Sequence, residues 1–210
     1  MPEPVIFYTN PMSRGQIVRW ALEESGAAYE TVIVEYGADM KAPDYLAVNP
    51  MGKVPAVRHG GRVVTECAAI CAWLAEAFPE AGLAPQPDER AAYHRWMFFA
   101  AGPLEQAITA QAMGWTTEED RSAMLGFGTY NDTVDAVEAL LRDTDYVCGG
   151  RFTMADVYVG SHIEWGLGFG TLPKRPAFEA YAGRIAEREA HKKARAIDAA
   201  LIAEREAASS

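Results

Sequence analysis

The chain has 210 residues, of which 50% are hydrophobic and 23% charged, a composition typical of a globular protein with a sizeable core. Its formal net charge of −10 argues against a protein that wraps a nucleic acid or lies on an anionic membrane. The longest apolar run, Cys67 to Ala75, is too short to span a bilayer. Three irregularly spaced cysteines and an N-terminus without a signal-peptide pattern predict a cytoplasmic protein.

Strand and helix signals alternate at the start of the chain. The apolar run Val5 to Tyr8 ends at Asn10-Pro11, which indicates a buried strand followed by a turn. Ser13 is a suitable N-cap for a helix that ends at Gly26. Tyr29 to Val34 is rich in β-branched residues and predicts a second strand. A strand, a helix and a strand in this order form a parallel crossover unit.

A weak helix over 41–46 precedes two more strands and a helix. Val54-Pro55 lies in the first of these strands, and a Gly60-Gly61 hairpin leads to the second. Because proline cannot donate to a strand ladder, we expect a free strand edge there, with a cis bond as one way to form it. Glu66 then opens an amphipathic helix that ends near Pro79.

The segment from Pro79 to Asp88 contains three prolines and no helical period, so it reads as a linker. Helical patterns follow it and strand patterns disappear. We expect helices from Asp88 to about Gly114, from Thr117 through Leu141, from the capping box at Thr153–Asp156, from Pro176, and from Ala186 onward. The predicted organisation is an α/β domain over 1–79, a linker over 80–87 and an all-helical domain over 88–210.

Two motifs in the α/β part carry a family resemblance. NPMGKVP (residues 49–55) and TECAAICAWLAEAFP (residues 65–79) resemble the glutathione-binding half of the cytosolic glutathione S-transferases, in particular their bacterial and fungal branch. The resemblance implies a thioredoxin-like N-terminal domain and a C-terminal helical bundle that supplies a pocket for an electrophile. It also implies that glutathione is the co-substrate, and that its activated thiol attacks a small apolar electrophile.

The glutathione-binding residues implied by this resemblance lie around Val54 and Glu66. The backbone of Val54, before Pro55, would pair with the cysteinyl part of the tripeptide. Glu66 would accept hydrogen bonds from the ammonium group, and the N–H of Cys67 at the helix start would hold the neighbouring carboxylate. Family members usually carry serine or threonine at the position of Cys67. Lys53 is either a ligand of the glycine carboxylate or a solvated surface charge.

The thiolate donor should lie in the loop after the first strand. Ser13, at the head of the helix, resembles the seryl donor of one branch of the family, whereas Tyr8 resembles the tyrosyl donor of another. We expect Ser13 to be the catalytic donor and keep Tyr8 as the alternative. Arg14 opposes the helix dipole in the first turn, which indicates a role near an anion. Since the loop has no cysteine, thiol-reductase chemistry is disfavoured.

The rival to an enzyme is a non-catalytic binding or regulatory module with the same fold, because fold does not imply function. The four histidines have no metal-ligand spacing, so we expect no metal site. By resemblance we also expect a homodimer, with Ala69, Ala72 and Trp73 of the Glu66–Phe78 helix facing the partner.

Overall fold

The computed structural model describes residues 3–115 and 119–208, and the chain divides into two compact units. The first unit comprises residues 1–83 and 187–210, and the second comprises residues 84–186. One division falls inside the expected linker over 80–87. The other was not expected: the predicted helical domain extended to residue 210, whereas the last helix packs into the first unit.

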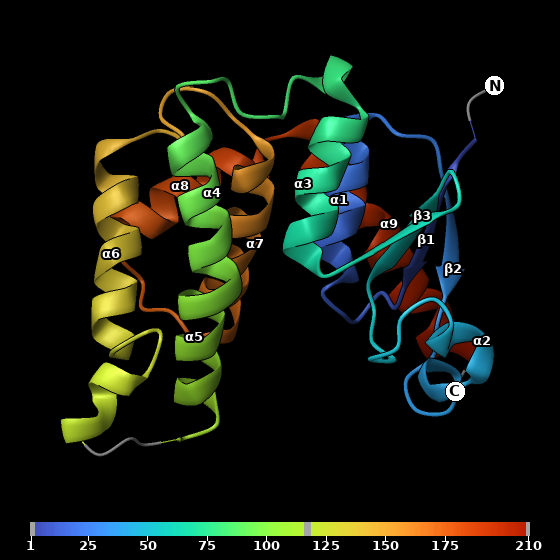
Figure 1. The fold of residues 1–210 in the computed structure, drawn as a ribbon, viewed down its shortest axis with the longest axis horizontal. Coiled ribbons are helices and arrows are strands. Elements are labelled where there is room, and N and C mark those ends of the chain that lie inside the picture. The colour runs from blue at the N-terminus through green and yellow to red at the C-terminus, as the bar shows by residue number, and fades with distance from the viewer. Residues whose placement is uncertain (1–2, 116–118, 209–210) are drawn as a thin grey trace. The chain divides into compact units, whose positions relative to one another are not determined.

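The first unit is a mixed α/β structure (Figure 1). Its helices and strands are β1 (Val5–Thr9), α1 (Gly15–Ser25), β2 (Tyr29–Ile33), α2 (Pro43–Leu46), β3 (Ala56–His59), β4 (Arg62–Thr65), α3 (Cys67–Ala77) and α9 (Glu189–Ala208). Short 3₁₀ turns, η1 (Asp39–Lys41) and η2 (Pro79–Ala81), precede α2 and follow α3. The predicted order of strands and helices up to Pro79 is confirmed.

The four strands form one sheet in the order β2-β1-β3-β4. β1 and β2 run parallel, as the crossover through α1 requires, and β3 runs antiparallel to β1 and β4. The free edge expected along the strand after Val54-Pro55 is therefore wrong for β3 itself, which is paired on both sides. Val54 and Pro55 lie before the strand and outside the ladder.

The two faces of the sheet are covered by different helices. The Arg19 guanidinium of α1 lies 5.2 Å from the centre of the Phe7 ring, so Phe7 faces α1. Tyr8 must point to the opposite face because successive strand residues alternate. There it packs with α2, whose Tyr45 ring lies 5.9 Å away. α1 also packs against α3 and α9, which places most of the buried core of this unit on the α1 side.

A buried ion pair joins α9 to α1. The Nε of Arg19 lies 2.7 Å from Oδ1 of Asp198, and the two side chains are 1% and 3% exposed. The Arg19 guanidinium also donates to the hydroxyl groups of Thr31 and Tyr29 in β2. Burial raises the pKa of the Asp198 carboxyl, and the charge of Arg19 opposes that rise. Removal of one partner would leave a buried charge uncompensated, so this pair holds α9 in place.

The second unit is helical throughout its regular structure. It consists of α4 (Arg90–Phe99), α5 (Glu105–Ala112), α6 (Tyr130–Asp143), α7 (Met154–Phe169) and α8 (Pro176–Ala186), with a π-helical turn η3 (Ala100–Leu104) between α4 and α5 and a 3₁₀ turn η4 (Glu119–Met124) before α6. The expected start of one helix at Thr117 lies outside the described residues. The regular helix in that region begins only at Tyr130, where Thr129 caps it by accepting from the N–H of Asp132.

The predicted capping segment of α7 forms one of the most buried polar sites in the second unit. The Asp156 carboxylate accepts from the N–H of Thr153 at 2.8 Å and from the N–H of Val147 at 2.7 Å. It also accepts from the hydroxyl of Tyr181 at 2.9 Å. This carboxylate therefore fixes the start of α7 to the preceding loop and to α8.

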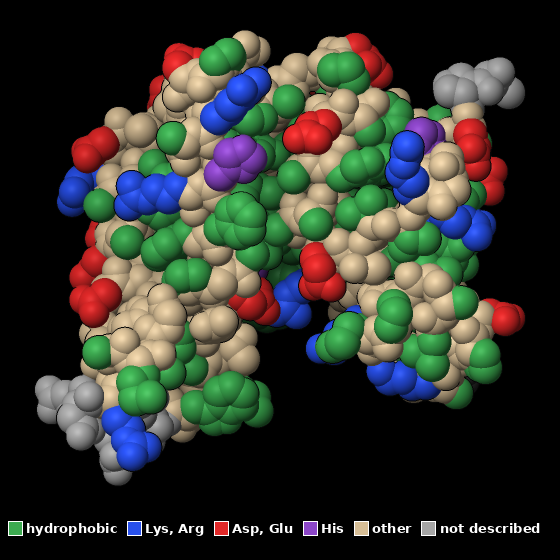
Figure 2. All heavy atoms as spheres, in the orientation of Figure 1, with side chains coloured by type: hydrophobic (Ala, Val, Ile, Leu, Met, Phe, Trp, Pro, Cys, Tyr) green, Lys and Arg blue, Asp and Glu red, His purple; other side chains and the backbone are tan. Residues whose placement is uncertain are grey.

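The surface carries charges of both signs. On the face drawn in Figure 2, acidic and basic side chains are interspersed, and the described basic residues visible there do not merge into one patch. Within residues 3–115 and 119–208, every helix falls short of the length or the apolarity that a membrane crossing requires.

Candidate functional site

The register of the sheet brings three predicted segments to the same end. Ala56 lies opposite Tyr8 on one side and opposite Thr65 on the other. Because β3 is antiparallel to both neighbours, the residues before Ala56 lie beside those that follow Tyr8 and Thr65. Val54-Pro55, the loop after β1 and the Glu66-Cys67 turn therefore meet at one sheet end.

The Asn10 side chain ties the loop after β1 to Val34, the residue that follows β2. This side chain is fully buried, donates through Nδ2 to the carbonyl of Val34 at 3.2 Å and accepts from the N–H of Met12 at 3.1 Å. The carbonyl of Asn10 in turn accepts from the N–H and the hydroxyl of Ser13, at 3.0 and 2.7 Å. Asn10 thus shapes the loop that presents Ser13.

Ser13 lies just before the first turn of α1 and is partly exposed. Its Oγ accepts from the N–H of Gly15 at 2.9 Å. The helix begins at Gly15 with Arg14 in the N-cap position, so the expected N-cap role of Ser13 is shifted by one residue. Because the Ser13 hydroxyl donates to the Asn10 carbonyl, it must rotate before it can donate to a ligand. The hydrogen bond that it accepts from the N–H of Gly15 can persist.

The start of α1 approaches β1 so closely that only glycine fits at residue 15. A Cβ built on Gly15 would lie 1.8 Å from Oγ1 of Thr9, which is fully buried. The short distance between Thr9 and the helix start leaves the Ser13 loop little room to shift.

Tyr8, the other candidate donor, lies in different surroundings. It packs with the buried cluster formed by Val34, Met40 and Tyr45, on the α2 side of the sheet. It also lines a cavity of about 420 Å³ there. Burial, together with the nearby Tyr8, raises the pKa of Tyr45 to about 12. Within the described residues, no hydrogen bond or ring contact joins Tyr8 to Ser13.

The segment before β3 is held by the side chains of α2 and its following turn. The carbonyl of Lys53 accepts from the hydroxyl of Tyr45 and from Nδ2 of Asn49, both at 2.7 Å. The Val54–Pro55 peptide bond is cis. Within residues 3–115 and 119–208, neither the N–H nor the C=O of Val54 forms a hydrogen bond. Both groups are thus available to an extended ligand, and the Lys53 side chain is exposed beside them.

The Glu66-Cys67 turn has an unusual backbone conformation. Glu66 has φ of +67° and is the one non-glycine residue of the described chain with positive φ. Such a conformation costs of order 1–3 kcal/mol and is concentrated at functional sites. The Glu66 side chain is exposed at the start of α3, and the helix dipole there attracts anions.

Cys67 connects this turn to the Ser13 loop. Its Sγ lies 3.6 Å from the carbonyl of Arg14, so the starts of α3 and α1 are neighbours. The predicted residues Ser13, Arg14, Val54, Pro55, Glu66 and Cys67 thus border one sheet end. Lys53 directly precedes Val54, and the side chain of Tyr8 packs on the α2 side of the sheet.

Sequence reasoning missed the residues that support this site. Asn10 was read only as part of a turn, although an asparagine before proline is a known signal for a side chain that shapes a loop. Asn49, which holds Lys53, gave the same kind of signal before Pro50. Within the described residues, no three His, Cys, Asp or Glu side chains cluster in a way that would bind a metal.

Comparisons with known proteins match both units. The profile of the glutathione S-transferase N-terminal domain matches residues 12–77, and that of the C-terminal domain matches residues 62–165. Glutathione S-transferase GstA of Escherichia coli O157:H7 is 30% identical over 149 residues, which cover 69% of this chain and 73% of that protein. Maleylacetoacetate isomerase of Pseudomonas aeruginosa is 28% identical over 83% of this chain and 89% of its own length.

A solved structure agrees with these sequence matches. A glutathione transferase homologue from Sulfitobacter, crystallised with bound glutathione, superimposes with a TM-score of 0.72 at 27% identity. The match covers 90% of this chain and 96% of that one. With both domain profiles matched and the fold shared, the chain belongs to the glutathione S-transferase family.

Proposed function

We propose that this glutathione transferase binds the tripeptide across the sheet end formed by Val54, Glu66 and the Ser13 loop, and that Ser13 activates its thiol. The observation that carries the proposal is the unpaired backbone of Val54, at the sheet end where the Ser13 loop and the strained Glu66 also lie. A peptide that pairs with Val54 extends toward both.

Each end of glutathione has a complementary partner in this arrangement. The exposed Glu66 carboxylate accepts from the ammonium group of the γ-glutamyl residue. The N–H of Cys67 and the N-terminus of α3 hold the adjacent carboxylate. Lys53, exposed beside Val54, meets the glycine carboxylate, and Arg14 adds positive charge near the bound anion.

The chemistry requires the thiolate form of glutathione. A free thiol has a pKa of about 8.5, so most of it is protonated at neutral pH. A hydrogen bond from the Ser13 hydroxyl, together with the N-terminus of α1, favours the ionised form. The thiolate attacks an electrophilic carbon: a C–S bond forms, and the leaving group departs with the electron pair of the bond that breaks.

We propose a small apolar electrophile as the second substrate. Met12, next to Ser13, is 68% exposed, and Tyr36 is 58% exposed and donates from its hydroxyl to the carbonyl of Met12. These side chains offer an apolar surface beside the bound sulfur. Detoxification of such compounds by a homodimer in the cytoplasm fits the family, and the three cysteines are all free thiols, as in a reducing compartment.

Two matched substitutions test the donor. Ser13→Ala and Tyr8→Phe each remove one hydroxyl, and Tyr8→Phe keeps the ring that packs on Tyr45. Because a hydrogen bond to a charged group contributes about 1.5–3 kcal/mol, we expect Ser13→Ala to lower kcat/KM at neutral pH by roughly ten- to a hundredfold. In the same variant, the pKa of the thiol of bound glutathione, measured from the ultraviolet absorbance of the thiolate, should rise.

Tyr8→Phe should leave both quantities unchanged. The opposite pattern, with loss in Tyr8→Phe and none in Ser13→Ala, would identify the tyrosyl donor and contradict the assignment. Steady-state assays with an activated aryl halide give kcat/KM for all three proteins. If the wild-type protein binds glutathione but turns over no electrophile, the non-catalytic binding module becomes the better description.

A further inference from the structure

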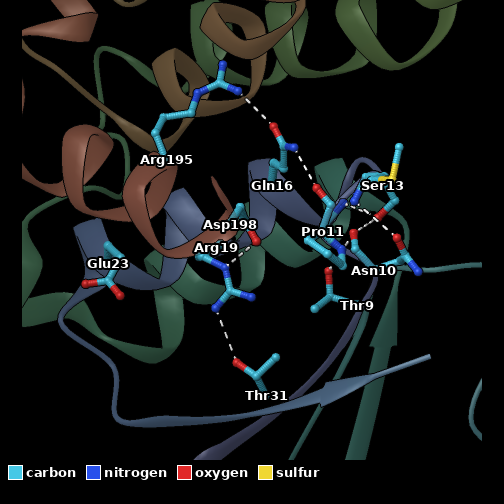
Figure 3. A network of polar contacts seen from close by, with 12 residues as sticks. Thr9, Asn10, Pro11, Ser13, Gln16, Arg19, Glu23, Thr31, Arg195 and Asp198 are labelled. Carbon is cyan, nitrogen blue, oxygen red and sulfur yellow. Dashed lines mark hydrogen bonds and ion pairs between the residues drawn. The ribbon is translucent and has the colours of Figure 1, made fainter. Parts of the chain in front are cut away.

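The C-terminal helix is connected to the Ser13 loop by a chain of two hydrogen bonds. Nη1 of Arg195 in α9 donates to Oε1 of Gln16 in α1 at 2.8 Å. Nε2 of the same Gln16 donates to the carbonyl of Pro11 at 2.6 Å. Figure 3 shows the three residues in line from α9 to the loop that carries Ser13.

The donors and acceptors in these two hydrogen bonds allow only one orientation of the Gln16 amide. A guanidinium can only donate, so it selects the carbonyl oxygen of the Gln16 amide. The NH₂ group of that amide then points to Pro11, whose carbonyl can only accept. Arg195 therefore fixes which way the Gln16 amide faces, and the bond to Pro11 depends on that choice.

Arg195 is itself held in place by the packing of α9. It lies three residues before Asp198, on the same side of the helix, and Asp198 forms the buried ion pair with Arg19. Since α9 is anchored there, Arg195 approaches Gln16 from a fixed backbone. Gln16 and Arg195 are both only partly exposed.

The carbonyl of Pro11 adjoins the part of the loop that determines where the Ser13 hydroxyl lies. Pro11 follows Asn10, whose carbonyl holds the Ser13 hydroxyl at 2.7 Å. On the other side of the loop, Asn10 donates to the carbonyl of Val34, the residue that follows β2. The loop is thus held through Asn10 by the segment after β2 and through Gln16 by α9.

We propose that Gln16 and Arg195 are positioning residues that set the geometry of the Ser13 hydroxyl, so that α9 contributes to thiol activation without touching glutathione. The inference rests on the proposed role of Ser13 as thiolate donor. It assigns to a helix far along the chain an effect on the pKa of the bound thiol.

A matched control exists on the same pair of helices. Nζ of Lys193 lies 2.7 Å from Oε2 of Glu23, near the opposite end of α1. Lys193→Met removes a contact between α9 and α1 without touching the Gln16 connection. This control variant should weaken the packing of α9 on α1 in general, as the other variants do, but leave the Ser13 loop in place.

The experiment measures the pKa of bound glutathione and the kcat and KM of the protein in four single variants and one double variant. Gln16→Ala should raise that pKa by about half a unit to one unit and lower kcat at neutral pH by about two- to tenfold. Gln16→Glu keeps the Arg195 contact but puts an oxygen against the Pro11 carbonyl, so its loss should be at least as large. Arg195→Met should also raise the thiol pKa and lower kcat, but by less than Gln16→Ala. Lys193→Met should change neither the thiol pKa nor kcat.

The double variant Gln16→Ala/Arg195→Met should be no worse than Gln16→Ala alone, because Arg195 acts through Gln16. Circular dichroism at each pH verifies that every variant is folded. If glutathione binds and Gln16→Ala leaves the thiol pKa and kcat unchanged, the positioning role is wrong while the proposed function stands. The same conclusion follows if Lys193→Met matches Gln16→Ala. If the wild-type protein binds no glutathione, the proposed function fails and the positioning role fails with it.

Discussion

Cys67 is a proposed glutathione ligand at a position where the family resemblance leads us to expect serine or threonine. Its main-chain N–H stands at the start of α3 and can still meet a carboxylate. Its thiol is a weak donor, and Sγ already lies 3.6 Å from the carbonyl of Arg14. The side chain therefore adds little to the binding of an anion.

Replacing Cys67 by serine should strengthen glutathione binding. A hydroxyl of similar size donates a full hydrogen bond to the carboxylate, and a typical hydrogen bond contributes about 0.5–1.5 kcal/mol, so the Kd should fall by roughly two- to tenfold. Isothermal titration of Cys67→Ser against the wild-type protein measures the change, with Cys71→Ser as a control on the buried face of α3. An unchanged or weaker Kd in Cys67→Ser would show that this thiol does not face the ligand.

The sequence favoured Ser13 over Tyr8 as the proposed donor but left both open. Both hydroxyls lie within a few residues of the β1 end, and residue spacing does not state which face of a strand meets which helix. In the structure, Phe7 faces Arg19 of α1 and Tyr8 therefore faces Tyr45 of α2. That Val54, Glu66 and Cys67 lie at one sheet end was easier to predict, because each is next to a backbone feature, either a proline or a helix start.

The start of α4 is held by a charged contact inside the second unit. Glu89, in the N-cap position of α4, accepts from Nε of Arg151 at 3.1 Å and from the N–H of Gln86 at 2.7 Å. Arg151 also donates to the carbonyl of Ala84 at 2.8 Å. The hydrogen bonds from Arg151 lower the pKa of the Glu89 carboxyl, so the folded state favours its charged form.

This shift predicts how Glu89 contributes to stability as the pH changes. Because the pKa of the folded state is the lower one, the contribution is fully present above the ordinary value of 4.5 and is lost as the pH falls through the folded value. The difference in unfolding free energy between wild type and Glu89→Gln should therefore be largest near neutral pH and shrink below pH 4.5. Urea unfolding at several pH values measures it.

Arg151→Met should show the same direction of pH dependence, since either change removes the ion pair between Arg151 and Glu89. A difference between wild type and Glu89→Gln that grows as the pH falls would contradict the lowered pKa.

Helix boundaries in the second unit were predicted with uneven success. The helix expected from Asp88 to about Gly114 exists, but Pro103 lies in the π-helical turn between α4 and α5. Proline lacks the N–H that a regular α-helix needs there, and a widened turn accommodates it. The capping box at Thr153–Asp156 marked the start of α7 correctly, because it is a local hydrogen-bond pattern that the sequence itself encodes.

The packing of the last helix illustrates a limit of sequence reasoning about the whole fold. The helical pattern after Ala186 predicted α9, yet nothing in that pattern states that it packs on α1. The contact depends on Arg19 meeting Asp198, and the two lie 179 positions apart. Only the tertiary fold brings these two residues together. The assignment of α9 to the first unit therefore could not follow from composition alone.

The proposed homodimer predicts a mass that can be measured. On α3, Ala69 is exposed and Ala72 and Trp73 are partly exposed, which leaves an apolar face for a partner. We expect sedimentation equilibrium at micromolar concentration to give twice the chain mass of 22.9 kDa. Ala69→Glu should shift the population toward the monomer, because burying a charge in such an interface is unfavourable.

The matched control is Ala199→Glu, the same change at an exposed alanine of α9. A wild-type protein that sediments as a monomer would rule out the dimer. Equal dissociation by Ala69→Glu and Ala199→Glu would show that α3 is not the contact surface.

Calorimetric titration of the purified protein with glutathione, near neutral pH and in two buffers of different ionisation enthalpy, would examine thiol activation directly. If the site holds the thiolate, binding releases a proton, and the observed enthalpy will differ between the buffers by the proton count times the difference in buffer ionisation enthalpy. We predict proton release in the wild-type protein and its reduction in Ser13→Ala. Binding with equal enthalpy in both buffers, or no binding at millimolar glutathione, would contradict activation of the thiol at this site.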